Sequence, residues 1–185
     1  VVFIHVVSAL ALIQWNPELV HTALKMFRVH VSTELLAFEG YLVEAVDGLV
    51  FAAFSKASDA FRWIARCLQT IKNLPWPEEL LAHAACEELV TVMRNEALGG
   101  HLEEVVLFRG LRLKAGVDSG KMRGEINKLT GRMMYRGKVV TRASRIAGAA
   151  GTGQILASSF VWREYEETAE TMEKPGSLSE EEGMF

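Results

Sequence analysis

The sequence predicts a single α+β domain whose helices pack on a mixed, mostly antiparallel sheet. Three observations predict this class. Apolar runs typical of strands alternate with segments of helical period along residues 1–165. An Asp-Gly pair at positions 47 and 48 separates two apolar runs, which is a strong indication of a β-hairpin. Half of the 185 residues are hydrophobic, so the chain can bury one substantial core.

The first elements are a buried strand and a long helix. Residues 1–7 form a continuous apolar run rich in β-branched residues, which is typical of a strand covered on both faces. Asn16 and Pro17 are residue types that cap and begin helices, and apolar residues recur at helical spacing from there to about Phe38. Gly40 is predicted to end this helix.

A hairpin and a second helix follow. Runs 41–46 and 49–54 flank the Asp-Gly pair and form its two predicted strands. Ser58 or Asp59 can cap the next helix, which ends before Pro75 because proline cannot continue it.

The sequence of the second half of the domain predicts shorter elements. Residues 78–96 have a helical pattern, and we interpret 76–109 as an insertion or an extended helical connection. The remaining predicted elements are a half-exposed strand at 111–117, a hairpin partner at 121–126, an apolar segment at 133–135, a helix at 139–149, a strand at 154–157 and a short helix capped by Ser158 or Ser159. Residues 166–185 are Glu-rich and predict an acidic tail without stable structure.

Composition excludes several classes of protein. A net charge of -3 argues against nucleic acid as a principal partner. No stretch reaches the roughly 18 uninterrupted apolar residues of a membrane span, and residues 1–12 lack the basic start of a secretory signal. Cys67 and Cys86 have no metal-ligand spacing, so we expect reduced thiols in a cytosol-facing part of a longer protein.

Residues 131–146, GRMMYRGKVVTRASRI, resemble the helix segment of class III adenylyl/guanylyl cyclases, which usually reads Trp-Gly-Asp-Thr-Val-Asn-x-Ala-Ser-Arg. Residues 153–158, GQILAS, are similar to that family's Gly-Gln-Ile-x-Val-Ser strand. Three further stretches agree in order and spacing. They are 3–12 with the first metal-binding strand, 40–54 with the family hairpin, and 111–120 with its Ile-Gly-x-x-x-Gly strand. The resemblance covers about residues 1–165.

The resemblance implies a ferredoxin-like nucleotide cyclase fold that acts as a dimer, with a purine nucleoside triphosphate in the groove between two subunits. In active members two aspartates, one on the first strand and one in the hairpin, hold two Mg²⁺ or Mn²⁺ ions. Such ions activate the ribose hydroxyl and neutralise charge on the phosphates. An Asn and an Arg of the partner orient the ribose and stabilise the transition state.

This chain departs from the family at the metal positions. His5 stands at the first aspartate, and a neutral imidazole is a poor magnesium ligand. The ungapped alignment places Gly48 at the second aspartate. Asp47 could replace it only through a register shift, which turns a side chain to the opposite face of a strand unless a bulge intervenes. Asp47 and Gly48 also suit a simple type I' turn, so no metal site is expected.

Other family positions are partly retained. Thr141 occupies the Asn position, and Arg145 matches the catalytic arginine one helical turn later. Glu44 matches the residue that accepts from the guanine edge in guanylyl cyclases, whereas Met134, at the second base-recognition position, cannot do so by hydrogen bonding. The basic residues close to these positions form a predicted phosphate or anion site made of Arg136, Lys138 and Arg142.

We therefore interpret the chain as a degenerate class III cyclase domain that acts in dimerisation or in regulation of cyclic-nucleotide signalling. The alternative is an active cyclase that converts GTP or ATP to the cyclic 3',5'-monophosphate. In that case the chain is one half of a heterodimer whose partner supplies the aspartates that bind Mg²⁺ or Mn²⁺. A homodimer would require Asp47 to reach the metal. The family also occurs in ciliary and membrane-receptor proteins, but no residue of this sequence indicates such a context.

Overall fold

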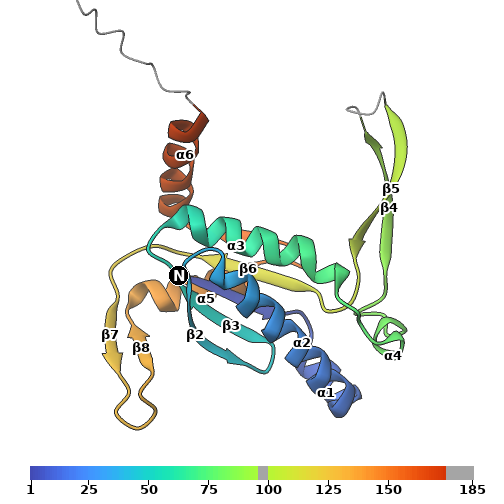
Figure 1. Ribbon diagram of the computed structural model, residues 1–185, viewed down its shortest axis with the longest axis horizontal. Coiled ribbons are helices and arrows are strands. Elements are labelled where there is room, and N and C mark those ends of the chain that lie inside the picture. The colour runs from blue at the N-terminus through green and yellow to red at the C-terminus, as the bar shows by residue number, and fades with distance from the viewer. Residues whose placement is uncertain (96–99, 174–185) are drawn as a thin grey trace, which may run out of the picture.

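A computed structural model describes residues 1–95 and 100–173 as a five-stranded sheet, two separate hairpins and the helices packed on them (Figure 1). The sheet has the strand order β2-β3-β1-β6-β9, and all neighbours are antiparallel except β6 and β9. The elements are β1 (Val2–Val6), α1 (Ala9–Trp15), α2 (Pro17–Leu36), β2 (Tyr41–Val46), β3 (Leu49–Ala53), α3 (Ala57–Thr70), the 3₁₀ turn η1 (Ile71–Asn73), α4 (Glu78–Leu81), β4 (Leu89–Asn95), β5 (His101–Phe108), β6 (Leu113–Val117), β7 (Arg123–Ile126), β8 (Met133–Arg136), α5 (Lys138–Ala149), β9 (Ile155–Ala157) and α6 (Ser159–Glu173). The predicted α+β class is confirmed.

The sheet is covered on both faces because its central strands are apolar on both sides. On β1, Val2, Ile4 and Val6 belong to the larger core, which also contains the buried faces of α2 and α3. Val1 and Phe3 point the other way, into a smaller core formed with α5. The strand alternates as expected from the period of two, and each set of side chains meets a different helix layer.

Helix α5 approaches the sheet closely at Gly116 of β6. A Cβ atom at this position would lie 2.2 Å from the backbone nitrogen of Ala147 and 2.6 Å from the carbonyl oxygen of Ala143. Only glycine therefore allows the backbones of β6 and α5 to pack directly against each other. This contact places α5, which carries Thr141 and Arg145, on the face of the sheet opposite α2 and α3.

Two predicted local structures are confirmed in detail. The side chain of Asn16 accepts a hydrogen bond from the backbone nitrogen of Leu19 at 3.2 Å and so caps α2. Asp47 and Gly48 have φ values of 42° and 82°, and both residues of a type I' turn require positive φ. The Asp-Gly pair is thus the turn of the β2–β3 hairpin.

The first helix after β1 was not predicted. Ser8 has φ of 58°, in the left-handed region, and turns the chain out of the strand. Residues Ala9–Trp15 then form α1, which buries Leu12. The capping prediction for α3 was also wrong, because the helix begins at Ala57 and Lys56 stands at its N-cap without a side-chain bond.

The prediction of a helix over 78–96 was wrong. Within 78–95, the part of this range that the structure describes, only the four residues of α4 are helical, and β4 pairs with β5 as an antiparallel hairpin. Val90, Thr91 and Val92 are all β-branched, which favours a strand. The long-range partner strand decides the outcome. The hairpin extends away from the main sheet (Figure 1).

The predicted pairing of 111–117 with 121–126 was also wrong. Strand β6 lies between β1 and β9, so both of its edges are already occupied and it is an interior strand rather than a half-exposed one. Strand β7 therefore pairs with β8, in a second hairpin beside the sheet. The predicted helix at 139–149 and the strand at 154–157 are confirmed as α5 and β9.

Helix α6 extends further than the predicted short helix. It continues to Glu173, past residue 166 where the acidic tail was expected to begin. Glutamate and alanine favour helices, which accounts for the extension. The rest of the predicted tail, 174–185, lies outside the described residues. None of the described helices has both the length and the apolar character needed to cross a bilayer.

Candidate functional site

The first predicted metal position lies at the end of β1. His5 is directly opposite Lys114 of β6 and Leu49 of β3 in the antiparallel ladders. Its Nε2 atom is buried and has no hydrogen-bond partner within the described residues. Burial, followed by the charge of Lys114, lowers the pKa of the His5 imidazole. Near neutral pH this position therefore holds a neutral imidazole beside an ammonium group.

The second predicted metal position is occupied by the turn of the β2–β3 hairpin. The carbonyl oxygen of Gly48 accepts a hydrogen bond from the nitrogen of Val6 at 2.7 Å, which ties the turn to β1. Val46 and Leu49 pair directly across the turn, and the register of β2 shifts earlier, between Leu42 and Glu44. Asp47 is exposed and lies on the rim of the same hollow as His5. It also borders a second hollow beside Lys25 and Arg28 of α2.

The two predicted base-recognition residues lie together. Glu44 of β2 and Met134 of β8 line one hollow of about 290 Å³, with Asn127 and Arg136 also on its wall. A β-bulge between Leu42 and Glu44 changes the register of β2 at this point. A bulge of this kind re-aims side chains, and the sequence carries no pattern from which it could have been predicted.

Thr141 and Arg145 lie on the exposed side of α5, one helical turn apart. The opposite side of the helix is buried through Val139, Ala143 and Ala147. Within the described part of the chain neither Thr141 nor Arg145 has a hydrogen-bond or ion-pair partner. Both side chains are thus free to meet a ligand or a second subunit.

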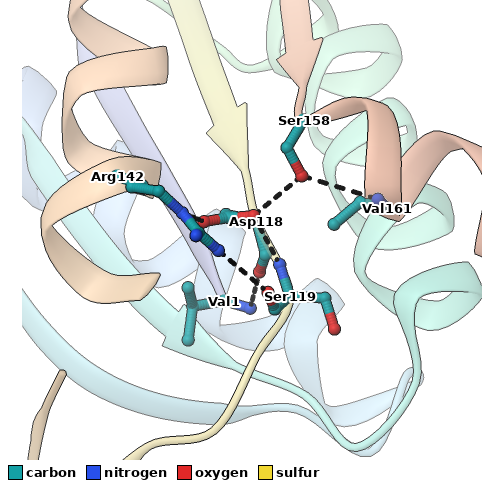
Figure 2. A network of polar contacts seen from close by, with 6 residues as sticks. All are labelled: Val1, Asp118, Ser119, Arg142, Ser158 and Val161. Atoms are coloured by element: carbon teal, nitrogen blue, oxygen red, sulfur yellow. Dashed lines mark hydrogen bonds and ion pairs between the residues drawn. The ribbon is translucent and has the colours of Figure 1, made fainter. Parts of the chain in front are cut away.

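The three basic residues predicted as one anion site have different surroundings. Arg136 and Lys138 are exposed near the start of α5. Arg142, in contrast, donates from Nε to Oδ2 of Asp118 at 2.6 Å and from a terminal nitrogen to the carbonyl oxygen of Ser119 at 3.4 Å (Figure 2). The hydrogen bond to Asp118 raises the pKa of the Arg142 guanidinium. Arg142 is therefore already bound to a carboxylate.

Sequence reasoning missed Asp118. It follows the predicted strand at 111–117 and precedes the hairpin partner predicted at 121–126, where an exposed connection is expected, but its side chain is fully buried at the end of β6. A carboxylate directly after an apolar strand could have suggested a buried, bonded group, since an isolated buried charge is strongly unfavourable. Its two side-chain partners, Arg142 and Ser158, come from distant parts of the chain.

No protein-family model matches the chain. Among curated proteins it is similar to fungal adenylate cyclases. It is 27% identical to the adenylate cyclase of Podospora anserina over 179 residues, which are 97% of this chain and 8% of that protein. It is 32% identical to the adenylate cyclase of Mycosarcoma maydis over 143 residues, which are 77% of this chain and 5% of that protein. The chain thus spans less than a tenth of the length of these two relatives.

Solved structures share the fold. An adenylate cyclase from Trypanosoma brucei, studied in its monomeric state, superposes with a TM-score of 0.73 at 16% identity, covering 92% of this chain and 75% of that chain. A guanylyl cyclase domain of the RhoGC fusion protein from Blastocladiella emersonii, solved as a non-canonical dimer, gives a TM-score of 0.67 at 12% identity, covering 90% of this chain and 82% of that chain. At these identities the likeness establishes the architecture alone.

Proposed function

We propose that this chain, which belongs to the class III adenylyl/guanylyl cyclase catalytic domains, is a degenerate member of that family. In this proposal it acts through dimerisation with another cyclase domain, or through regulation of one, and does not cyclise nucleotides by itself. Its place is the cytosol-facing part of a longer protein. The observation that carries the proposal is the pairing of His5, near the end of β1, with Lys114 of the neighbouring strand β6.

These groups do not fit a magnesium or manganese ion. Mg²⁺ takes oxygen ligands in a nearly ideal octahedron. His5 presents a neutral imidazole nitrogen, and the adjacent Lys114 adds a positive charge that repels a cation. The Lys114 ammonium is held in place by a hydrogen bond of 2.9 Å to the carbonyl oxygen of Gly148. Both the donor atoms and the local charge therefore oppose a divalent ion.

The hairpin does not compensate for the missing carboxylate on β1. Among the described residues that line the hollow beside His5, Asp47 is the one carboxylate. One carboxylate does not match the two that the family uses. Lys25 and Arg28 border the second hollow with Asp47 and place two basic side chains there. We therefore derive no catalytic step through a metal held by this chain.

The hydrogen-bonding groups that the family directs at a nucleotide bound by the partner are better retained. The exposed Arg145 guanidinium can stabilise negative charge on a phosphate, and the hydroxyl of Thr141 can hydrogen-bond a ribose. Glu44 can accept the two donors of a guanine edge in the hollow that it shares with Met134. The chain thus keeps groups that can contact a nucleotide but lacks a matching set of metal ligands. This difference supports the second candidate function, a heterodimer in which the partner holds the Mg²⁺ or Mn²⁺ ions.

A cyclase assay separates these functions. The chain alone, with Mn²⁺ and either GTP or ATP, is expected to form no cyclic nucleotide above a blank without protein. The chain is then mixed with a cyclase domain that carries both aspartates but has its own catalytic arginine replaced. No activity in the mixture supports the regulatory or dimerising role. Turnover by the chain alone contradicts both proposals.

Turnover in the mixture has its own control. If it depends on this chain, Arg145→Ala should abolish it, because that change removes the guanidinium proposed to contact the phosphates. Arg62→Ala, which removes an exposed arginine from α3 on the other face of the sheet, should leave it unchanged. Equal loss in both variants would show that the effect is not specific to the site.

Restoring the acids tests the missing metal site. His5→Asp replaces a half-buried group next to Lys114 and should be tolerated. Gly48→Asp is expected to be strained, because Gly48 has φ of 82° and a Cβ atom there would lie 2.9 Å from Cβ of Ala9. Binding of Mn²⁺ by the doubly substituted chain, measured by calorimetry, therefore has to be compared with its folded fraction. Tight Mn²⁺ binding by the unsubstituted chain would contradict the proposal.

A further inference from the structure

Among the polar residues whose exposure the structure describes, Asp118 alone is buried. It lies directly after β6, and its side chain is fully inaccessible. A buried carboxylate is tolerated only when hydrogen bonds or an opposite charge replace its hydration. Its partners therefore show what holds this part of the fold together.

The two carboxylate oxygens of Asp118 are bonded to different elements (Figure 2). Oδ2 accepts from Nε of Arg142 on α5 at 2.6 Å. Oδ1 accepts from Oγ of Ser158 at 2.7 Å and from the backbone nitrogen of Ser119 at 3.0 Å. One carboxylate thus connects α5 with the residue that precedes α6.

Ser158 has a second role at the same atom. Its Oγ accepts a hydrogen bond of 3.5 Å from the backbone nitrogen of Val161, in the first turn of α6. The hydroxyl therefore caps α6 while it donates to Asp118. Hydrogen bonds in series polarise one another in a low-dielectric interior, so the cap and the Arg142 pair are linked through a single buried group.

We propose that Asp118 is a positioning residue that couples helix α6 to helix α5. When the start of α6 moves, Ser158 moves with it and draws the Asp118 carboxylate, and Arg142 transmits this displacement to α5. Thr141 and Arg145 lie on the same helix, directly before and three residues after Arg142. The coupling of the two helices does not depend on the proposed function. Only its consequence for a nucleotide at Thr141 and Arg145 rests on it.

The surroundings of α6 suit such a coupling. The helix is attached to α3 by aromatic contacts of Phe61 with Trp162 and Tyr165. Beyond this contact it extends away from the sheet at one end of the molecule (Figure 1). Trp162 remains about half exposed, so a partner can reach this side of α6. In this proposal a displacement of α6 caused by a bound partner reaches α5, on the opposite face of the sheet, through Ser158, Asp118 and Arg142.

Hydrogen exchange of the whole chain, measured by mass spectrometry without nucleotide, tests the coupling. Ser158→Ala should speed exchange of the α5 amides by about three- to tenfold, the effect of losing one hydrogen bond of ordinary strength. Ser158→Thr keeps the hydroxyl and should preserve the protection of α5. Ser159→Ala changes an exposed neighbour on the same helix and should leave α5 as in the original chain.

A second background completes the test. Asp118→Asn keeps the size of the side chain but loses the charge that binds Arg142, so α5 should exchange faster while the chain remains folded. In that background Ser158→Ala should produce little further change in α5. The proposal is overturned if Ser158→Ala speeds exchange in α6 alone, or if the two substitutions have additive effects on α5. Because no nucleotide is present, neither result depends on whether the chain takes part in cyclisation.

Discussion

Replacing Gly116 by alanine should destabilise the domain, because α5 packs directly on the backbone of β6 at this residue. The added Cβ would lie 2.2 Å from the backbone nitrogen of Ala147, whereas ordinary contacts begin near 3.4 Å, so α5 has to retreat by about 1 Å. The obstacle is backbone, which cannot rotate away as a side chain can. We expect a loss of about 3 kcal/mol in the free energy of unfolding, at the upper end for overpacking.

The retreat should also disturb the smaller core. Val139, Ala143 and Ala147 of α5 pack there against Phe3 and Phe51, whose rings stack with centroids 4.5 Å apart. Urea denaturation followed by circular dichroism measures the change, and a lower midpoint with an unchanged slope would identify a loss of native stability.

Gly148→Ala is the matched control on the same helix. Apart from the neighbouring backbone of α5 itself, a Cβ atom at Gly148 meets nothing within 4 Å, so alanine there should stabilise α5 by about 0.5–1 kcal/mol through its higher helix propensity. The two substitutions should thus have opposite signs. If Gly116→Ala were as stable as the original chain, the close packing of α5 on β6 would be refuted.

Two further changes test local features of the fold. Ser8→Gly should raise the free energy of unfolding by about 1 kcal/mol in thermal or urea unfolding, since Ser8 has a left-handed φ of 58° that glycine adopts without strain; an unchanged or lower stability would contradict this. Burial lowers the pKa of His30, against the opposing effect of Glu34 and with a smaller lowering effect from Arg66, so the unfolded chain binds a proton more readily than the folded chain. Stability should therefore fall as pH decreases below the ordinary histidine pKa of about 6.5. His30→Gln keeps a hydrogen-bonding group facing Thr70 and should make this decrease of stability with falling pH shallower. Urea titrations at several pH values measure it, and His5, whose pKa is also lowered, accounts for a remaining decrease. An identical slope in both proteins would refute the assignment to His30.

Long-range pairing was the part of the fold that the sequence left open. Residues 78–96 have an apolar period compatible with a helix, yet Leu89–Asn95 forms a strand because His101–Phe108 pairs with it. Residues 121–126 were expected beside β6, but the two edges of that strand are taken by β1 and β9. In both cases a local pattern allowed two structures, and a partner distant in the chain selected one.

The candidate site divides in the same way. Helix α5 with Thr141 and Arg145 and the Asp-Gly turn follow from the sequence, because each depends on neighbouring residues and on their spacing. The tertiary structure alone decided that Asp118 is buried with Arg142 and Ser158, and that a bulge brings Glu44 to the hollow of Met134. Burial and strand register are properties of contacts between segments far apart in the chain, and no local pattern contains them.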